Sequence, residues 1–198
     1  MAGTYVLERS FEAAMQLELR ADGTYLYALS VGALDERSQG SWSVTPGGTI
    51  TFATTPRPEA PEFERLADGT VQDSPYLIVI WPNGVPVQGI NVALQCANGA
   101  TAYGYTLDTG WPYEGPEEDM GGDDLCDDPQ SLRLIEPVHD VYSPAYDVAG
   151  AGGGLRFVLH PNDMGVRDMT DWQASVTGNR IRLLHESEGA AVLVRLPR

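Results

Sequence analysis

The sequence predicts an all-β protein, a discontinuous small antiparallel barrel that carries an inserted β-sandwich module. Two observations lead to this fold class. Short segments alternate between apolar and polar residues, as half-buried strands do, and no long helical pattern interrupts them. The 22 glycines and 14 prolines stand between these segments, where the chain must turn. A chain of 198 residues with 42% hydrophobic content can also bury a real core.

The first block predicts about four antiparallel strands, which are too few to close a barrel. Turns are expected at Ala21-Asp22-Gly23 and Pro46-Gly47-Gly48 because glycine supplies the backbone freedom that tight hairpins need. The apolar faces of the four strands are expected to carry Met15, Leu17, Leu19, Tyr25, Tyr27, Leu29, Trp42, Val44, Ile50 and Phe52.

The next segment is predicted to connect two domains, with residues 61–69 as the linker. It carries Pro56, Pro58, Pro61 and Pro75 among acidic residues, and proline cannot donate to a sheet ladder. The inserted module is expected at 70–151, with one strand at Ile90–Cys96 and one or two more between residues 132 and 148. The glycine run at 149–154 is expected to be a flexible joint.

The tail returns to hairpins, with apolar positions at Leu155, Phe157, Leu159, Val176, Ile181, Leu183, Val192, Val194 and Leu196. Exposed sheet edges invite aggregation, so the opening sheet and the closing hairpins should pair with each other. That pairing gives one barrel from residues 1–60 and 152–198. The alternative is a simple tandem of a four-stranded sheet domain and a C-terminal sandwich.

The stretch from Tyr76 to Trp111 runs an apolar strand into Pro82-Asn83-Gly84 and an alternating strand into Asn98-Gly99, then turns again at Asp108-Thr109-Gly110. This order resembles the transthyretin-like or carboxypeptidase-regulatory-like β-sandwich module. The resemblance covers about a fifth of the chain and implies a module that binds or spaces rather than catalyses.

The outer segments resemble the small lipocalin-like barrels of bacterial envelope proteins. The resemblance rests on residues 17–25 (LELRADGTY), on 32–36 (GALDE), and on Gly40-Ser41-Trp42. It implies a ligand-carrying barrel. The sequence departs from the lipocalin pattern in one respect, since the family's Gly-x-Trp opens the first strand and here follows two strands.

Charge separates the middle of the chain from its flanks. The net charge is −16, and the interval between Arg65 and Arg133 holds 11 of the 28 acidic residues and no arginine. So acidic a protein should repel nucleic-acid phosphates and anionic membrane surfaces, which require basic patches. We therefore expect no nucleic-acid partner. The absence of lysine also excludes Schiff-base chemistry and Walker-type phosphate loops.

An acidic loop from Glu114 to Asp128 places eight carboxylates within 15 residues. Calcium takes six to eight oxygen ligands, so this loop is the candidate metal site, although its spacing does not match an EF-hand. The alternative is a solvated acidic loop with no metal, and no other cofactor is expected. The candidate calcium ligands are Asp119, Asp123, Asp124, Asp127 and Asp128.

The two cysteines, Cys96 and Cys126, both fall in the acidic block and permit a disulfide that closes a loop of about 30 residues. The alternative is two unpaired thiols, one on a core-facing strand position and one in a loop.

Two groups of aromatic residues are candidates for binding. Tyr25, Tyr27 and Trp42 lie on predicted inward faces, where they either line a small-ligand pocket in the barrel mouth or fill the core. Tyr103, Tyr105, Trp111 and Tyr113 cluster beside the acidic loop and are candidates for a protein or glycan contact surface, or are half-buried sheet residues.

No residue is assigned a catalytic role. The sequence contains neither a GxSxG nor an HExxH motif, and its histidines, His139, His160 and His185, are widely separated. The leading hypothesis is a non-enzymatic binding or envelope-associated protein whose acidic module is the contact surface for a protein or small ligand. A ligand-carrying barrel and an unrecognised hydrolase are the alternatives.

No apolar run reaches the roughly 18 residues that a membrane span needs. The N-terminus lacks the basic start and apolar core of a signal peptide. We therefore expect either a cytoplasmic protein or a periplasmic or extracytoplasmic one whose leader is absent from this sequence. The sequence determines neither the partner nor the oligomeric state.

Overall fold

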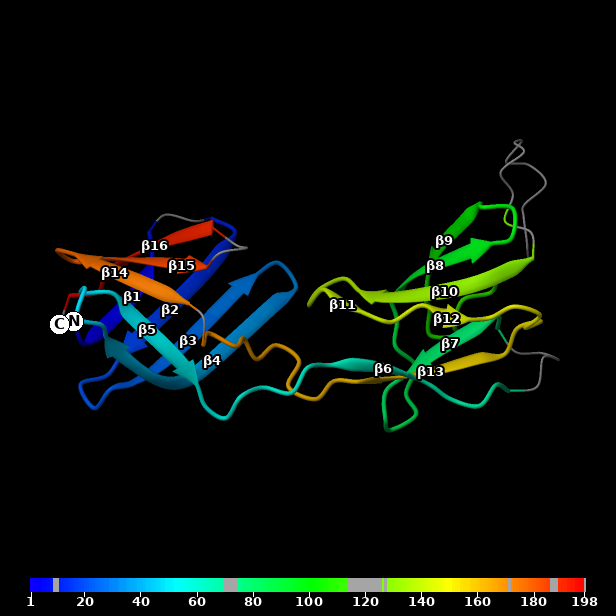
Figure 1. Ribbon diagram of the computed structural model, residues 1–198, viewed down its shortest axis with the longest axis horizontal. Coiled ribbons are helices and arrows are strands. Elements are labelled where there is room, and N and C mark those ends of the chain that lie inside the picture. Colours follow the sequence, from blue (N-terminus) through cyan, green and yellow to red (C-terminus); the bar gives the residue numbers. More distant parts are fainter. Residues whose placement is uncertain are drawn as a thin grey trace. The chain divides into compact units, whose positions relative to one another are not determined.

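The computed structural model describes residues 1–8, 11–69, 75–113, 126, 128–170, 172–185 and 189–197. Within these residues the chain forms sixteen β-strands. They divide into two compact units, one made of Met1–Glu59 with Asp163–Arg198 and the other of Ala60–Asn162. Figure 1 shows both units, and each is described separately below. The predicted all-β class is confirmed.

The first unit is a closed barrel of eight antiparallel strands in the order β1-β16-β15-β14-β5-β4-β3-β2. Its strands are β1 (Gly3–Leu7), β2 (Ala13–Leu19), β3 (Thr24–Val31), β4 (Leu34–Val44), β5 (Ile50–Thr54), β14 (Gln173–Thr177), β15 (Arg180–His185) and β16 (Gly189–Arg195). The barrel closes where β1 pairs with both β2 and β16, since Tyr5 lies opposite Leu17 on one side and Arg195 on the other. The predicted pairing of the opening sheet with the closing hairpins is confirmed.

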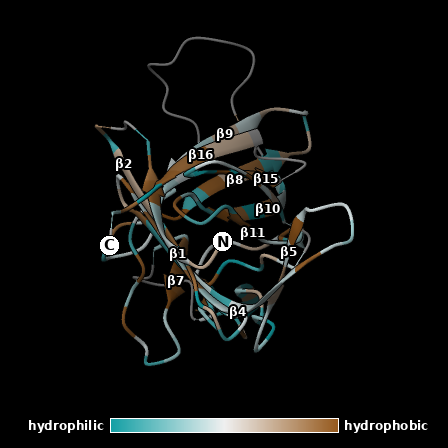
Figure 2. Cartoon of the chain, turned by 90° about the vertical axis from the view of Figure 1, so that its left-hand side faces the viewer, coloured by the Kyte–Doolittle hydropathy of each residue, from teal (hydrophilic) through white to brown (hydrophobic). Residues whose placement is uncertain are grey.

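The barrel interior is filled by apolar side chains that alternate with exposed ones along these strands. Figure 2 colours the strands by hydropathy, and both hydrophobic and hydrophilic stretches occur on them. The buried cluster consists of Tyr5, Leu17, Leu19, Tyr25, Tyr27, Ile50, Phe52, Met169, Trp172, Ala174, Ile181, Leu183 and Leu193. Met169 and Trp172 come from the irregular segment before β14. The ring of Trp172 lies 6.1 Å from that of Tyr27, so this segment contributes to the core although it is not a strand.

The predicted hairpin turns owe their geometry to local contacts. Gly23 and Gly48 have φ angles of 85° and 83°, a region that only glycine adopts without strain. The Asp22 carboxylate accepts a hydrogen bond from the Thr24 amide at 2.9 Å. Hydrogen bonds from the hydroxyl and amide of Thr24 lower the pKa of Asp22, which keeps this turn acceptor ionised.

The second unit contains two sheets. The first has the order β11-β10-β8-β9, with β12 also paired to β10, and the second has the order β6-β13-β7. Their strands are β6 (Glu62–Arg65), β7 (Leu77–Ile80), β8 (Asn91–Cys96), β9 (Thr101–Tyr105), β10 (Pro129–Glu136), β11 (Val141–Tyr142), β12 (Tyr146–Asp147) and β13 (Leu155–His160). Tyr146 joins the two sheets, because its ring lies 4.9 Å from that of Phe157 and its hydroxyl donates to the Phe63 carbonyl.

Strand β13 differs from the expectation that the segment starting at Leu155 belongs to the barrel. It pairs antiparallel with β6 and parallel with β7, so it is the central strand of the second sheet. Its two faces both carry buried residues, which suits a central strand. Strand β6 lies in the segment predicted as a linker. The glycine run, expected to be flexible, is held by hydrogen bonds such as that from the Gly154 amide to the Pro75 carbonyl.

The inserted unit begins and ends at one connection of the barrel, between β5 and β14. The two chain segments meet there in reciprocal hydrogen bonds. The amide of Glu59 donates to the Asp163 carboxylate at 2.9 Å, and the amide of Asp163 donates to the Glu59 carbonyl at 3.1 Å.

Candidate functional site

The barrel residues predicted to bind a ligand lie at the interior face. Tyr25 and Tyr27 are 1% and 3% exposed and belong to the core cluster, while Trp42 is half-buried against it. The Tyr25 ring meets Phe52 edge-on at 5.2 Å. The indole of Trp42 donates to the Arg20 carbonyl at 3.1 Å. Each ring therefore has a packing role, and ligand binding by these three residues stays a prediction.

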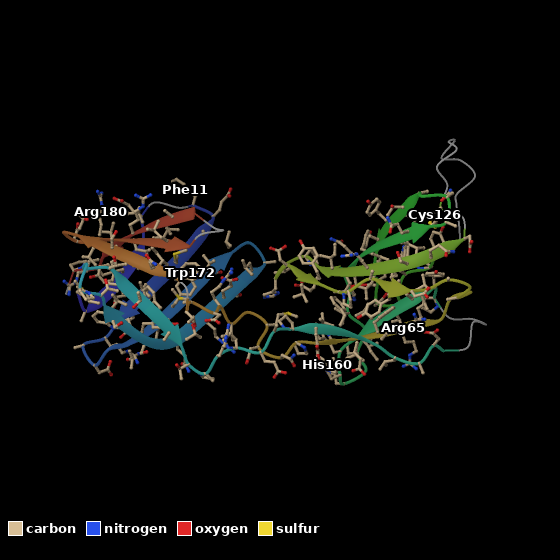
Figure 3. The ribbon with its side chains drawn as sticks, viewed as in Figure 1. Phe11, Arg65, Cys126, His160, Trp172 and Arg180 are labelled. Atoms are coloured by element: carbon tan, nitrogen blue, oxygen red, sulfur yellow. A yellow bond between two sulfur atoms is a disulfide. The ribbon has the colours of Figure 1, made fainter. Side chains whose placement is uncertain are left out.

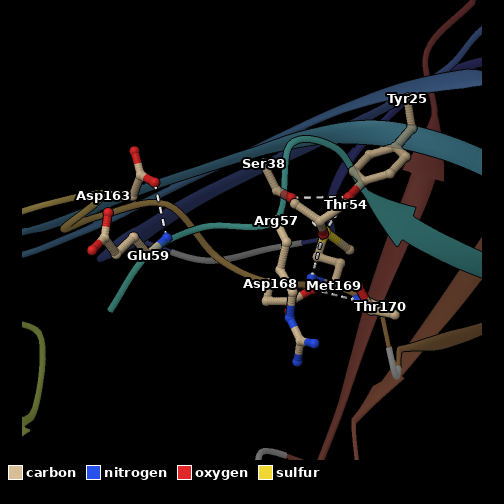
Figure 4. Close-up of polar contacts among 9 residues, drawn as sticks. All are labelled: Tyr25, Ser38, Thr54, Arg57, Glu59, Asp163, Asp168, Met169 and Thr170. Atoms are coloured by element: carbon tan, nitrogen blue, oxygen red, sulfur yellow. Dashed lines mark hydrogen bonds and ion pairs between the residues drawn. The ribbon is translucent and has the colours of Figure 1, made fainter. Parts of the chain in front are cut away.

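A buried hydroxyl network closes one end of the barrel (Figure 4). The Tyr25 hydroxyl hydrogen-bonds to the hydroxyls of Ser38 and Thr54, both at 2.9 Å. The Thr54 hydroxyl also accepts a hydrogen bond from the Met169 amide at 2.7 Å. Strands β3, β4 and β5 are thereby connected to the segment that leads into β14, without leaving the tyrosine hydroxyl unsatisfied.

Asp168, the residue before Met169, holds the segment that leads into β14 through its contacts with Thr170 and Arg57. Burial raises the pKa of the Asp168 carboxyl. Hydrogen bonds from Thr170, together with Thr54 and the nearby Arg57 guanidinium, outweigh burial, so the pKa lies below its ordinary value. The carboxylate stays ionised at neutral pH and keeps its ion pair with Arg57 at 3.2 Å.

A pocket of about 630 Å³ lies on the outer flank of the barrel, which we call the flank pocket. One wall is the outward face of β2, β3 and β4, and the other comes from residues 56–58 and 163–166. Its polar lining residues are Gln16, Arg37, Ser38, Gln39, Thr54 and Asp163, and Tyr27 of the predicted ligand-binding group also lines it. Its apolar lining side chains include Leu26, Ala28, Pro56, Pro58 and Val166. No pattern in the sequence predicts this pocket.

The inserted unit presents three exposed tyrosines on one face of its sheet β11-β10-β8-β9. Tyr103 and Tyr105 of β9 are 78% and 60% exposed, and Tyr142 of β11 is 63% exposed. The paired positions across the four strands are Tyr105, Asn91, Ile135 and Tyr142. Because neighbouring strands lie about 4.8 Å apart, this row spans about 14 Å.

We call this surface the tyrosine face. Strand alternation and register assign to it Asn91, Ala93, Gln95, Thr101, Tyr103, Tyr105, Ser131, Arg133, Ile135, Tyr142 and Asp147. Of these positions only Arg133 and Asp147 carry charge. The face is therefore close to neutral although the whole chain carries a net charge of −16.

Gly104 lies between the two tyrosines of β9, and contacts on the opposite face of the strand explain why this residue is a glycine. A Cβ added at Gly104 would lie 2.3 Å from the indole nitrogen of Trp111. Trp111 thus packs directly against the backbone of β9, on the face away from Tyr103 and Tyr105. The glycine allows this close approach, and the indole supports the edge strand that carries both tyrosines.

Of the predicted calcium ligands, Asp119, Asp123, Asp124 and Asp127 lie outside the described residues. Asp128 is described, with a φ angle of 52° and a carbonyl that accepts from the Ala97 amide at 3.0 Å. Within the described part of the chain, no group of three His, Cys, Asp or Glu side chains could hold a metal ion. Calcium binding by the acidic loop stays a prediction.

Cys96 and Cys126 form a disulfide, with their Cα atoms 5.3 Å apart (Figure 3). Both cysteines are buried. Cys96 is the last residue of β8, the strand that pairs with β9. The disulfide therefore attaches Cys126 to the end of a strand that contributes to the tyrosine face. The Tyr113 hydroxyl adds a second link by donating to the Cys126 carbonyl at 2.6 Å.

The described histidines each contact one glutamate. His160 Nε2 lies 2.8 Å from Glu64 across the β13–β6 pair, and His139 Nδ1 lies 3.2 Å from Glu136 in a turn. Glu136 also accepts the amides of the turn, a role typical of local structure. The side chain of His185 lies outside the described residues. These pairs give the hydrolase hypothesis no additional support.

Tyr76 belongs to an aromatic cluster with Trp111 and Tyr113, at ring distances of 6.0 and 5.2 Å. It is 8% exposed, and its hydroxyl has no hydrogen-bond partner among the residues that the structure describes. Burial raises the pKa of Tyr76 to about 12, Tyr113 adds to this effect, and the Arg65 guanidinium opposes it.

Replacing Tyr76 with phenylalanine should leave stability unchanged or raise it at neutral pH, because it removes a buried hydroxyl without a partner. At alkaline pH the two proteins should diverge. The unfolded tyrosine releases its proton near pH ~10 but the folded one only near about 12, so wild-type stability falls across that window. Urea unfolding at a series of pH values measures both effects.

Tyr25→Phe is the matched control, since the same hydroxyl is removed from a satisfied network. We expect it to lose about 1–2 kcal/mol at neutral pH. Equal losses in the two variants would contradict the assignment of Tyr76 as unsatisfied.

Comparison of the chain with protein-family models, curated proteins and solved structures finds no match. Among the described residues, no helix has the length and apolar character that crossing a membrane requires. The candidate sites therefore have to be interpreted from their own chemistry.

Proposed function

We propose that this protein is a non-enzymatic binding protein and that the tyrosine face is its contact surface for an uncharged glycan chain. The observation that carries the proposal is the exposure of Tyr103, Tyr105 and Tyr142 on one face of the sheet. Tyrosine is enriched in contact surfaces because its ring supplies apolar area while its hydroxyl can still hydrogen-bond. The barrel is then the scaffold of the inserted unit.

The chemistry of the face favours a sugar chain. The C–H faces of sugar rings can pack on exposed aromatic rings, and sugar hydroxyls can bond to the side chains of Asn91, Gln95 and Arg133. Tyr103 and Tyr105 are two residues apart on one strand, about 6.4–6.8 Å, so one extended polymer can contact both rings.

The near-neutral charge of the face argues against a basic protein as its occupant. Arg133 and Asp147 are its two charged positions, so the acidic excess of the chain lies elsewhere. Binding of a basic protein to the acidic block would weaken steeply with salt, since screening acts on exposed charges. Glycan stacking on tyrosines should be nearly independent of salt.

The double variant Tyr103→Ala/Tyr105→Ala should bind the target polysaccharide roughly tenfold to a hundredfold more weakly, because it removes two stacking rings. The measurement is affinity electrophoresis in native gels that contain dextran, xyloglucan, galactomannan or soluble starch. Tyr103→Phe/Tyr105→Phe keeps both rings and should retain most of the retardation.

Phe11→Ala is the control, since it removes an aromatic side chain of the barrel that is even more exposed than the two tyrosines and should not change retardation. The proposal is wrong if none of these polysaccharides retards the wild-type protein. It is equally wrong if the double alanine variant is retarded as strongly as the wild type.

The family resemblances belong to the same proposal. The up-and-down order of the barrel supports a relationship to lipocalin-like barrels, and the two-sheet arrangement of the inserted unit supports a transthyretin-like module. The disulfide supports an extracytoplasmic, envelope-associated location, since such bonds persist in oxidising compartments.

A further inference from the structure

We propose that the flank pocket of the barrel is a second, independent binding site for a small amphipathic carboxylate, with Arg37 as the group that binds the carboxylate. The inference does not depend on the glycan proposal, because every residue that lines the pocket belongs to the barrel unit. It rests on the position of Arg37, on the state of its acidic neighbours and on the apolar lining.

The backbone of Arg37 is fixed where the two walls of the pocket meet. Its amide donates to the Gly165 carbonyl at 2.9 Å, and its carbonyl accepts from the Arg167 amide at 2.8 Å. The strand register places Arg37 opposite Ala28, which in turn lies opposite Gln16. These three residues therefore share the outward face of the sheet, and all three line the pocket.

Two acidic groups near Arg37, Glu36 and Asp163, already have hydrogen-bond partners. Glu36 receives two hydrogen bonds from the Arg167 guanidinium, at 3.0 and 2.5 Å. The Asp163 carboxylate accepts the Glu59 amide at 2.9 Å. Within the described part of the chain, the Arg37 guanidinium itself makes no ion pair or side-chain hydrogen bond.

Arg37 belongs to the half of the described arginines that make no ion pair with a carboxylate, together with Arg133, Arg156, Arg182 and Arg195. Five described arginines are held in ion pairs with Asp or Glu, namely Arg20, Arg57, Arg65, Arg167 and Arg180. In a chain with a net charge of −16, a guanidinium without a carboxylate partner inside a pocket is complementary to an incoming carboxylate. A guanidinium can bind such a group through two parallel hydrogen bonds.

The rest of the pocket suits an apolar tail. Leu26 is 37% exposed, although it sits in a pocket wall with Ala28, Pro56 and Pro58. A volume of about 630 Å³ falls within the roughly 300–1,000 Å³ range of small-molecule sites. A pocket that combines apolar side chains with the Arg37 guanidinium and two amide side chains suits an amphipathic anion better than a fully polar one.

The test uses the full chain and two probes of equal length, decanoate and decanol, with binding measured by isothermal titration calorimetry. We expect decanoate to bind about tenfold or more tightly than decanol, because only the carboxylate can pair with Arg37. Arg37→Gln should abolish this preference by weakening decanoate and leaving decanol unchanged.

Two further variants make the result specific. Arg182→Gln removes an exposed arginine from β15 of the same barrel and should change decanoate affinity by less than about twofold. Ala28→Phe should fill the pocket and weaken both probes. Equal affinity for the two probes, or unchanged decanoate binding in Arg37→Gln, would overturn the proposal, as would the absence of decanoate binding. Tyr103→Ala/Tyr105→Ala should bind decanoate normally, so failure of one proposal leaves the other intact.

Discussion

Gly40→Ala is expected to destabilise the barrel by about 3 kcal/mol or more, which lowers its melting temperature by roughly 10–20 °C. A Cβ at this position would lie 2.0 Å from the Ala53 carbonyl oxygen and 2.9 Å from the Thr54 Cα. Both atoms belong to backbone, so no side chain can rotate away. Relief of the overlap requires β4 and β5 to separate, which also disturbs the hydrogen bond from the Met169 amide to Thr54.

Gly47→Ala provides the control, because the added Cβ meets only the Thr45 hydroxyl, at 3.8 Å, in an exposed turn. The φ angle of Gly47 is not in the left-handed region, so alanine should be tolerated with almost no change. Thermal unfolding followed by circular dichroism compares the two variants. Similar melting temperatures for both would contradict the close approach of β4 and β5 at Gly40.

Removing the disulfide through Cys96→Ala/Cys126→Ala should cost roughly 3–4 kcal/mol of stability in the inserted unit. The bridge closes a loop of 30 residues, and the chain-entropy argument gives this magnitude for a loop of that length. Hydrogen exchange resolves where the loss falls. Amides of β8 and β10 should exchange faster in the variant, while those of β3 and β4 should be unchanged.

Wild-type protein in the presence of a thiol reductant should reproduce the exchange pattern of the double variant. If neither treatment changes the exchange rates of β8 and β10, the bridge does not stabilise this unit. The same samples should show weaker polysaccharide retardation, because β8 supports the strand that carries Tyr103 and Tyr105.

The barrel could be predicted because its hairpins have a local sequence pattern, namely alternating apolar and polar residues on either side of a glycine turn. Met15, Leu17 and Leu19 alternate with polar residues, and the turn at Gly23 precedes a second alternating strand. The pairing of the opening sheet with the closing hairpins followed from the requirement that sheet edges be covered, and the structure makes it through β1 with β16 and β5 with β14. These arguments use period and turn chemistry, which short segments carry by themselves.

Other core positions could not be predicted from such patterns. Met169 and Trp172 enter the barrel core from an irregular segment, so no periodicity marks them. The apolar alternation of Leu155, Phe157 and Leu159 predicts a strand, but alternation does not determine which strands it pairs with. Partner choice depends on the tertiary arrangement, which placed β13 between β6 and β7.

The two candidate sites differ in how visible they are in the sequence. The aromatic cluster of Tyr103, Tyr105, Trp111 and Tyr113 predicts a contact surface, and the structure places the first two of them on the exposed face of β9. The flank pocket had no such sequence signal. Its walls come from Arg37 and from Val166, which are far apart in the chain and meet through a single backbone bridge.

The reciprocal hydrogen bonds between Glu59 and Asp163 have a consequence for how this architecture can be modified. The chain leaves the barrel at Glu59 and returns at Asp163, and these two residues are hydrogen-bonded to each other. An inserted domain is therefore compatible with the barrel when its two ends lie close together. The connection between β5 and β14 is thus a site where one inserted domain can be replaced by another. A graft there could exchange one recognition surface for another while the eight strands retain their register.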